Sequence, residues 1–233
     1  MRLAQLKDGY RYNSDTLMLY DFVLQNFSNL KGNVLDVGCG CGILGLLLKR
    51  DFKDINLLGI DIQDINVEIS NFNALANGIK AKFIALNFTD FKSDERFELI
   101  VSNPPYYHDG VKESQNEHIF KSRYCSNLRL ESFINVANSH LKPNGTICFC
   151  YEAGSLAEIL VCLKNAKLNP TAIKFIHPKE KSSAKLALIM AKKNSKSPCD
   201  INPPLILKFQ DRDSEEAKQI YARANTISTE YKC

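Results

Sequence analysis

The 233-residue sequence contains no apolar run of the roughly 18 residues that a membrane-spanning helix needs. Its first fifteen residues also lack a long apolar stretch, so a secretory signal is not expected. We therefore predict a cytoplasmic protein with no membrane partner. What the sequence does contain is a 45% share of hydrophobic residues, which at this length predicts one globular domain with a full core.

The eight cysteines include no C-x-x-C pair, because Cys39 and Cys41, and likewise Cys148 and Cys150, are separated by one residue. A chain of this length does not need a disulfide framework to stabilise its core. We interpret the cysteines as reduced thiols that serve as small apolar residues, in preference to a zinc site. His108 has no second metal ligand at useful spacing, so we predict no metal site.

The sequence lacks a large excess of charge of one sign, since the formal net charge is +4. Such a balance permits a nucleic-acid partner without requiring one. The charge is nevertheless uneven, because residues 164–196 carry many lysines against a single acid, Glu180. These lysines form either a solvated face or a patch that contacts phosphates, and the composition leaves both interpretations open.

Hydrophobic periodicity predicts an alternation of strands and helices. The expected helices cover residues 14–27, 42–50, 64–78, 131–145, 155–166 and 213–225. The first of them can be capped by Ser14 or Asp15. The expected strands cover residues 33–38, 55–62, 81–88, 97–103, 146–152, 169–178, 183–193 and 205–210, and residues 192–204 are expected to form a linker.

Strands that alternate with helices imply a mostly parallel sheet joined by right-handed crossovers. No helix is expected between the strands at 169–178 and 183–193, so these two should form an antiparallel hairpin. We divide the chain into a helical lead-in at residues 1–32, a main domain at residues 33–194, and residues 195–233, whose linker, strand and helix pack back on that domain.

The stretch VLDVGCGCGILGLLL places Asp36 at the end of a strand, followed by Gly38, Gly40 and Gly42 before a helix. Glycines at these positions let the backbone turn sharply and let a ligand touch it, while the helix offers free N–H groups. The spacing is G-x-G-x-G and not the dinucleotide pattern G-x-G-x-x-G, so a pyrophosphate ligand is disfavoured. The carboxylate of Asp36 suits a ligand that carries a cation or an amino group.

A second acid, Asp61, ends the next strand about 20 residues further on, where a carboxylate that binds ribose hydroxyls is expected. Asp61 can instead cap the following helix, a role that Asp64 can also fill. The combined order of strand, acid, alternating glycines, helix, strand and second acid is far more specific than a glycine loop alone.

The strand at 97–103 ends abruptly on the motif Asn103-Pro104-Pro105-Tyr106. In an open α/β sheet, ligands bind beyond the carboxyl ends of the strands, so Asn103 is expected at the ligand site. The alternative is a simple proline-rich turn, because a bare P-P pair is common after a strand.

From Val34 to Lys193, this constellation resembles the class I S-adenosylmethionine-dependent methyltransferases. The resemblance implies an α/β, Rossmann-like fold with a seven-stranded, mostly parallel sheet, an antiparallel C-terminal hairpin strand and helices on both faces. It implies S-adenosylmethionine as the cofactor, with the glycine loop at its methionine moiety, Asp36 near its amino group and Asp61 on its ribose. Many members contact the adenine through an acid, which here aligns with Asn87, and Asp90 is the alternative. The implied cofactor-binding set is Tyr12, Asp15, Asp36, Val37, Gly38, Gly40, Gly42, Asp61, Ile62, Asn87, Phe88 and Asn103.

The N-P-P-Y motif resembles that of methyltransferases acting on a planar, conjugated –NH2 group. The lone pair of such a nitrogen is delocalised, so the nitrogen attacks better when two acceptors pull its hydrogens out of plane. The resemblance assigns the acceptor roles to the Asn103 side-chain oxygen and the Pro104 carbonyl, and assigns a stacking role to Tyr106. The catalytic set is then Asn103, Pro104, Pro105 and Tyr106, and the target is adenine N6, cytosine N4, guanine N2 or glutamine N5.

Four stretches spread over nearly the whole chain resemble the bacterial valine-tRNA adenine-N6 methyltransferase family: YRYNSDTLMLYDF, NPPYYHDG, KSRYCSNLRLESFINVA and EEAKQIYARA. This resemblance implies N6-methylation of an adenine in tRNA, 3′ of the anticodon, with Tyr12 and Asp15 near the cofactor. The expected substrate-binding residues are Tyr106, Tyr107, Arg123, Lys179 and Lys181. Tyr107 can instead pack under the active-site loop.

We expect a monomer without an obligate protein partner. The alternative to a tRNA adenine enzyme is an N-methyltransferase that acts on a guanine of rRNA or on a protein glutamine. A non-catalytic RNA- or cofactor-binding module is a more remote alternative, because a binder has no use for two convergent acceptors.

Overall fold

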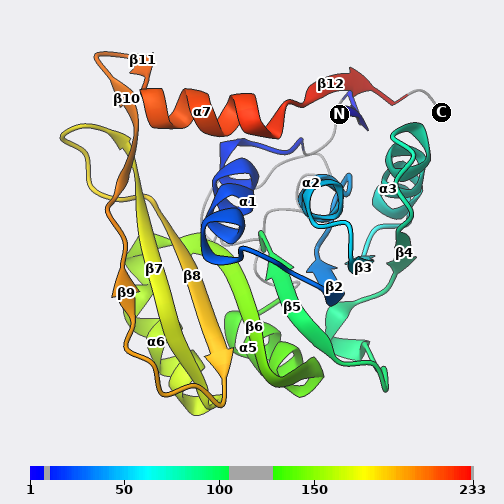
Figure 1. Ribbon diagram of the computed structural model, residues 1–233, viewed down its shortest axis with the longest axis horizontal. Coiled ribbons are helices and arrows are strands. Elements are labelled where there is room, and N and C mark those ends of the chain that lie inside the picture. Colours follow the sequence, from blue (N-terminus) through cyan, green and yellow to red (C-terminus); the bar gives the residue numbers. More distant parts are fainter. Residues whose placement is uncertain (8–10, 105–127, 232–233) are drawn as a thin grey trace.

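The computed structural model describes residues 1–7, 11–104 and 128–231 (Figure 1). Within these residues, ten strands form one central sheet. In spatial order its strands are β11 (Arg212–Asp213), β10 (Leu205–Phe209), β7 (Leu168–Lys179), β8 (Leu186–Lys193), β6 (Leu141–Glu152), β5 (Phe97–Ser102), β2 (Gly32–Val37), β3 (Ile55–Asp61) and β4 (Lys82–Ala85), and β9 (Asp200–Ile201) pairs with β7.

The seven strands from β2 to β8 form the core of this sheet. β8 runs antiparallel to its neighbours β6 and β7, and the other adjacent pairs among the seven are parallel. The predicted Rossmann-like class I fold with an antiparallel hairpin strand is therefore confirmed. Three short strands extend the sheet beyond β7, and one of them, β9, lies inside residues 192–204. The prediction of a linker there is partly wrong, because Ile201 pairs with Ile173.

Helices cover both faces of the sheet, as predicted (Figure 1). One buried cluster joins the sheet to α1 (Ser14–Asn26), α2 (Ile43–Asp51) and α3 (Asp64–Ala76). A second cluster, on the other face, joins it to α5 (Leu130–His140), α6 (Leu156–Asn165) and the short helix η1 (Phe88–Asp90). Another short helix, η3 (Ala153–Ser155), precedes α6. Among the described residues, no helix is both long and apolar enough to cross a membrane.

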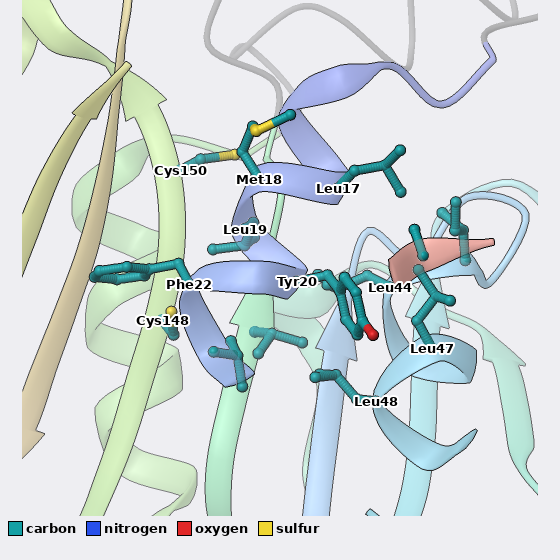
Figure 2. Close-up of a cluster of buried hydrophobic side chains, with 14 of the residues drawn as sticks. Leu17, Met18, Leu19, Tyr20, Phe22, Leu44, Leu47, Leu48, Cys148 and Cys150 are labelled. Atoms are coloured by element: carbon teal, nitrogen blue, oxygen red, sulfur yellow. The ribbon is translucent and has the colours of Figure 1, made fainter. Parts of the chain in front are cut away.

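Helix α1 is more deeply buried than a surface helix with one apolar face. All eight residues from Thr16 to Val23 are buried. Figure 2 shows why, since Tyr20 points toward Leu44 and Leu48 of α2 while Met18 and Phe22 lie on the side of β6. The helix begins at Ser14 and is capped by Asn13, whose side chain accepts a hydrogen bond from the backbone N–H of Asp15. The expected cap at Ser14 or Asp15 is therefore one or two residues too late.

Strand β6 passes between the two buried clusters and alternates between them, as a strand buried on both faces must. Cys148 and Cys150 point into the cluster around α1, whereas Phe149 and Tyr151 point into the cluster around α5. Both cysteines are free thiols and have no exposed surface. Figure 2 shows both of them on the side of β6 that faces α1.

The two ends of the chain meet in a second sheet that the sequence did not predict. β1 (Arg2–Gln5) pairs in parallel with β12 (Ile227–Glu230), and the Met1 amino group donates to the carbonyl of Asn225 at 2.7 Å. Residues 1–32 are therefore not a purely helical lead-in. Figure 1 shows this small sheet beside α3, with α7 (Glu215–Ala224) leading to it across the top of the molecule.

Candidate functional site

The glycine loop connects β2 to α2 and adopts the conformation that its sequence demands. Gly38, Gly40 and Gly42 have φ angles of 67°, 56° and 81°, a left-handed region that residues with a side chain rarely adopt. A Cβ atom added to Gly38 or Gly40 would meet no described atom within 4 Å. The loop backbone therefore borders open space that a ligand can occupy in direct contact with it.

Asp61, at the end of β3, braces this loop from the neighbouring strand. Its carboxylate accepts hydrogen bonds from the backbone N–H of Gly40 at 2.8 Å and of Gln63 at 2.9 Å, and from the side-chain amide of Asn66 at 3.0 Å. The predicted role of Asp61 on a ribose thus comes with a structural role that sequence reasoning missed. α3 begins at Asp64, and its N-cap residue Gln63 makes no side-chain capping bond.

Asp36, at the end of β2, is almost completely buried beneath the loop, with 1% of its surface exposed. It accepts a hydrogen bond from the backbone N–H of Gly45 in the first turn of α2, at 2.9 Å. Burial raises the pKa of the Asp36 carboxyl to about 7, and the negative charge of Asp61 adds to the rise while the Gly45 bond opposes it. A cationic group bound beside Asp36 would restore its charged form.

These residues line one cavity at the carboxyl ends of the parallel strands. It is bordered by Tyr12, Thr16, Asp36, Val37, Gly38, Cys39, Gly40, Cys41, Ile43, Leu44, Ile60, Asp61, Ile62, Gln63, Asn66, Leu86, Asn87, Phe88, Asn103 and Leu128. The cavity brings together most of the residues that the sequence predicts at a cofactor. Gly42 and Asp15 lie next to it in the chain rather than in its wall.

Asn103 lies one residue beyond β5 and reaches the same cavity from the strand beside β2. Its side-chain N–H donates to the Thr16 hydroxyl oxygen at 2.9 Å, and its side-chain oxygen accepts from the Cys150 thiol at 2.9 Å. Pro104, which follows, is buried. The candidate catalytic amide is thus held between α1 and β6 at the edge of the candidate cofactor cavity.

Asn87 lines the cavity, whereas its alternative, Asp90, is exposed at the end of η1. The Asn87 side-chain oxygen accepts from the backbone N–H of Thr89 at 3.1 Å and from the Thr89 hydroxyl at 2.9 Å. Both lone pairs of that oxygen are therefore engaged. The amide N–H groups are what Asn87 can offer an adenine, so it suits a ring nitrogen acceptor better than an amino donor.

Other predicted site residues have varied surroundings. Tyr12 lines the cavity and donates from its hydroxyl to Thr226 at 3.1 Å, while Asp15 lies beside Asn13, whose side-chain amide donates to it at 3.0 Å. Ile62, on the cavity wall, keeps 46% of its surface exposed and so offers apolar surface to a ligand. The predictions for Pro105, Tyr106, Tyr107, His108 and Arg123 lie outside the described residues.

Lys179 and Lys181 belong to the β7–β8 hairpin and are exposed there. β7 runs in the same direction as β6 and β5. The turn that follows β7 therefore lies at the carboxyl ends of the parallel strands, as Asn103 does. Lys179 pairs with Asp211 at 2.7 Å. Lys174, from the same lysine-rich stretch, is buried in an ion pair with Glu216 at 2.7 Å and cannot face a phosphate.

Sequence reasoning missed several residues of the site: Thr16, Gln63, Asn66 and Leu128 line the cavity, and the buried Cys150 donates to Asn103. Thr16 and Cys150 carry no motif of their own, because they follow from how α1 and β6 flank β5. Gln63 and Asn66 could have been predicted at the site, since both follow Asp61 closely in the chain. Leu128 follows a segment that the structure does not describe, and nothing in the sequence links it to the glycine loop.

The cavity fits S-adenosylmethionine by the chemistry of its walls. A buried carboxylate can meet the amino group, Asp61 can meet hydroxyls, the uncovered backbone of Gly38 and Gly40 admits close contact, and Ile62 and Phe88 offer apolar surface to a base. Among the residues that the structure describes, no group of three His, Cys, Asp or Glu side chains could hold a metal ion.

The sequence profile of the methyltransferase small domain family matches residues 18–161. The chain is also 43% identical over 94 residues to the ribosomal RNA small subunit methyltransferase C of Yersinia enterocolitica, which is 40% of this chain and 26% of that protein. It is 39% identical over 109 residues to the protein of the same name from Actinobacillus pleuropneumoniae, which is 46% of this chain and 30% of that protein. The chain thus spans less than a third of the length of these relatives.

Two solved structures share the fold. A protein from Agrobacterium tumefaciens described as a predicted O-methyltransferase superposes with a TM-score of 0.69 at 16% identity, covering 92% of this chain and 99% of that one. A Thermus thermophilus 16S rRNA N2 guanosine methyltransferase, in complex with AdoMet and guanosine, superposes with a TM-score of 0.59 at 19% identity, covering 81% of this chain and 45% of that one.

Fold and cavity together define a class I methyltransferase whose cofactor is S-adenosylmethionine, as predicted. More narrowly, the chain belongs to the methyltransferase small domain family. The two relatives from Yersinia enterocolitica and Actinobacillus pleuropneumoniae are named as rRNA methyltransferases. Their names do not support the predicted valine-tRNA methyltransferase.

Proposed function

We propose that this protein transfers a methyl group from S-adenosylmethionine to an exocyclic amino nitrogen of a purine in RNA, with guanine N2 of ribosomal RNA as the first candidate. The observation that carries the proposal is the position of Asn103, which lines the same cavity as Asp36 and the glycine loop. The names of the relatives support RNA as the substrate class and guanine as the base.

The chemistry needs little from the protein beyond positioning. S-adenosylmethionine, when bound, supplies a methyl group attached to a positively charged sulfur. The amino nitrogen forms the new N–C bond as the C–S bond breaks, the electron pair goes to sulfur, and the nitrogen then loses a proton to solvent. The Asn103 side-chain oxygen and the Pro104 carbonyl accept the two N–H hydrogens of the target and so localise the lone pair on nitrogen.

Adenine N6 of a tRNA is the second candidate. Guanine N2 and adenine N6 are both planar amino groups conjugated to a purine ring, so Asn103 and Pro104 serve either target equally. The observation that favours adenine is the similarity of four stretches, including YRYNSDTLMLYDF and EEAKQIYARA, to the valine-tRNA enzymes. The names of the relatives favour the guanine alternative over this prediction.

The deciding experiment uses RNA from the source organism with its gene for this protein deleted. Purified protein and methyl-labelled S-adenosylmethionine are added to separated small ribosomal subunits, tRNA and total protein, and the products are identified by mass spectrometry of nucleosides and peptides. We expect N2-methylguanosine in the ribosomal fraction. Label in N6-methyladenosine of tRNA would establish the second candidate. Label in glutamine alone, or no transfer to any fraction, would contradict the proposal.

A further inference from the structure

Resting on the proposed role of Asn103, we propose that Thr16 and Cys150 are positioning residues that fix the rotation of the Asn103 amide and aim its oxygen at the target amino group. The amide is bound at both ends, because its N–H donates to Thr16 and its oxygen accepts from Cys150, each at 2.9 Å. Thr16 lies on α1, Asn103 directly follows β5 and Cys150 lies on β6, so three elements converge on this amide.

The rotation of an asparagine amide is not settled by packing alone. Its terminal torsion is broad and roughly two-fold, so the nitrogen and oxygen can exchange places with little change in shape. An amide turned by half a circle would present N–H donors to a target that itself donates. Fixing the rotation therefore decides whether Asn103 attracts or repels the amino group.

Thr16 fixes the nitrogen end. It lies in the first turn of α1, is 5% exposed and lines the cavity. Its hydroxyl accepts from the Asn103 amide, and the bond ties the candidate catalytic residue to a helix that is buried along eight successive residues. The beginning of α1 is in turn set by the Asn13 cap.

Cys150 fixes the oxygen end. It has no exposed surface, and burial together with the negative charge of Asp15 raises its thiol pKa well above the usual range. The thiol therefore stays protonated and remains a donor at any pH the enzyme meets. A carboxamide oxygen has two lone pairs, so the Cys150 bond leaves one for the target.

Cys148 supplies a matched control. It lies two residues earlier on β6, points into the same buried cluster and is equally buried. Its side chain lies beside Phe22, away from the first turn of α1 (Figure 2). Cys148→Ala and Cys150→Ala remove the same atom from the same core, but only Cys150→Ala removes the donor to Asn103.

The test measures single-turnover methyl transfer, S-adenosylmethionine affinity by calorimetry, and the Tm of each variant. We expect Cys150→Ala to slow methyl transfer about ten-fold to a hundred-fold while cofactor affinity stays within about two-fold, because the loss is one of orientation. Cys150→Ser should recover most of the rate. Thr16→Val should behave like Cys150→Ala, and Thr16→Ser should keep the rate. Cys148→Ala should lower Tm as much as Cys150→Ala but leave the rate unchanged.

A second readout needs no RNA. With 15N in the asparagine side chains, the Asn103 amide protons should show altered shifts and faster solvent exchange in Thr16→Val and Cys150→Ala, but not in Cys148→Ala. Equal rates for the two alanine variants of cysteine, or an Asn103 amide signal unchanged in all variants, would overturn the positioning role. Wild-type protein that methylates no RNA while its amide signal responds as expected would instead refute the proposed function alone.

Discussion

The Asn103 side chain must both hold still and leave an oxygen lone pair available to a substrate. The bonds to Thr16 and Cys150 meet the first demand, and the second lone pair of the oxygen meets the other. At the scale of single residues, the site therefore consists of one recognisable sequence motif and of supporting side chains that belong to no motif. That is why the sequence indicated Asn103 and did not indicate its two supports.

Replacing Asn103 by alanine should separate chemistry from binding. Asp36, Asp61 and the glycine loop remain to bind the cofactor, so its affinity should change by less than about two-fold. Turnover should fall by about 10²–10³, the loss typical for one preorganised polar group at a transition state. Single-turnover transfer beside cofactor calorimetry checks this. A variant that still methylates at close to the wild-type rate would eliminate Asn103 as the acceptor.

Asp36 makes cofactor binding depend on pH. Its pKa of about 7 in the cofactor-free protein lies above the ordinary value of 3.8, so near pH 6 the group is mostly neutral. Affinity for the cofactor ammonium should rise about ten-fold from pH 6 to pH 8, as the carboxylate forms. Asp36→Asn should bind weakly with no such rise. Calorimetric titration of both proteins at several pH values measures the difference.

The same raised pKa predicts the sign of a stability change. Between about pH 4 and pH 7, Asp36 is mostly protonated in the folded protein and mostly ionised in the unfolded chain. The free energy of unfolding without cofactor should therefore fall over this range as pH rises. The fall should be smaller in Asp36→Asn. Urea unfolding at several pH values measures the free energy of unfolding, and an equal change with pH in both proteins would contradict a raised pKa of Asp36.

At the scale of elements, an ion pair near each end of α7 holds this helix to the molecule, to β7 near its start and to α1 near its end. Lys174 on β7 pairs with Glu216 near its start, and Asp21 on α1 pairs with Arg223 near its end at 2.6 Å. The Asp21 side chain is only 4% exposed and also accepts from Gln25. Burial raises the pKa of Asp21, and the charge of Arg223 opposes that rise.

Arg223→Ala should therefore destabilise the protein by about 1–3 kcal/mol, because a buried carboxylate loses its charged partner. Lys218→Ala is the control on the same helix. Lys218 pairs with Glu215 at 2.6 Å, but both side chains are more than half exposed, so its loss should cost about 0.5 kcal/mol or less. Urea unfolding compares the two, and equal effects would mean that Asp21 does not depend on Arg223.

The elements that could be predicted were those whose own residues show a clear hydrophobic pattern. The core strands β2 to β8 were expected because apolar runs between turn signals mark them. The pairing of β1 with β12 was not, because both strands are four residues long and their partners are more than 200 residues apart. β9 has only two residues, too few for any period to show.

At the scale of the whole molecule, three exposed lysines gather at one hairpin near the carboxyl ends of the parallel strands. Lys179, Lys181 and Lys185 surround the β7–β8 turn at the edge that carries the cofactor cavity, and all three are exposed. Lys193, in contrast, donates to the backbone carbonyl of Asn138 at 2.7 Å, so it serves the fold. The lysine-rich stretch of the sequence thus divides into lysines that serve the fold and exposed lysines that are candidates for contact with RNA.

Replacing Lys179, Lys181 and Lys185 together by alanine should weaken RNA binding and reduce the slope of log K against log salt by about two. Cofactor affinity should be unaffected. The control replaces three exposed lysines at the opposite edge, before or at the start of β3 and β4, namely Lys53, Lys80 and Lys82. Equal salt slopes for the two triple variants would show that net charge matters and the hairpin does not.

The meeting of β1 and β12 matters while the chain is being made. Asn73 of α3 joins β1 to the glycine loop, since its amide bonds to both backbone groups of Ala4 and donates to the carbonyl of Cys41 at 2.9 Å. β1 gains its sheet partner only when residues 227–230 have left the ribosome. This outer support of the cofactor loop can therefore form only after every strand of the central sheet has been synthesised, because β12 follows all of them in the chain.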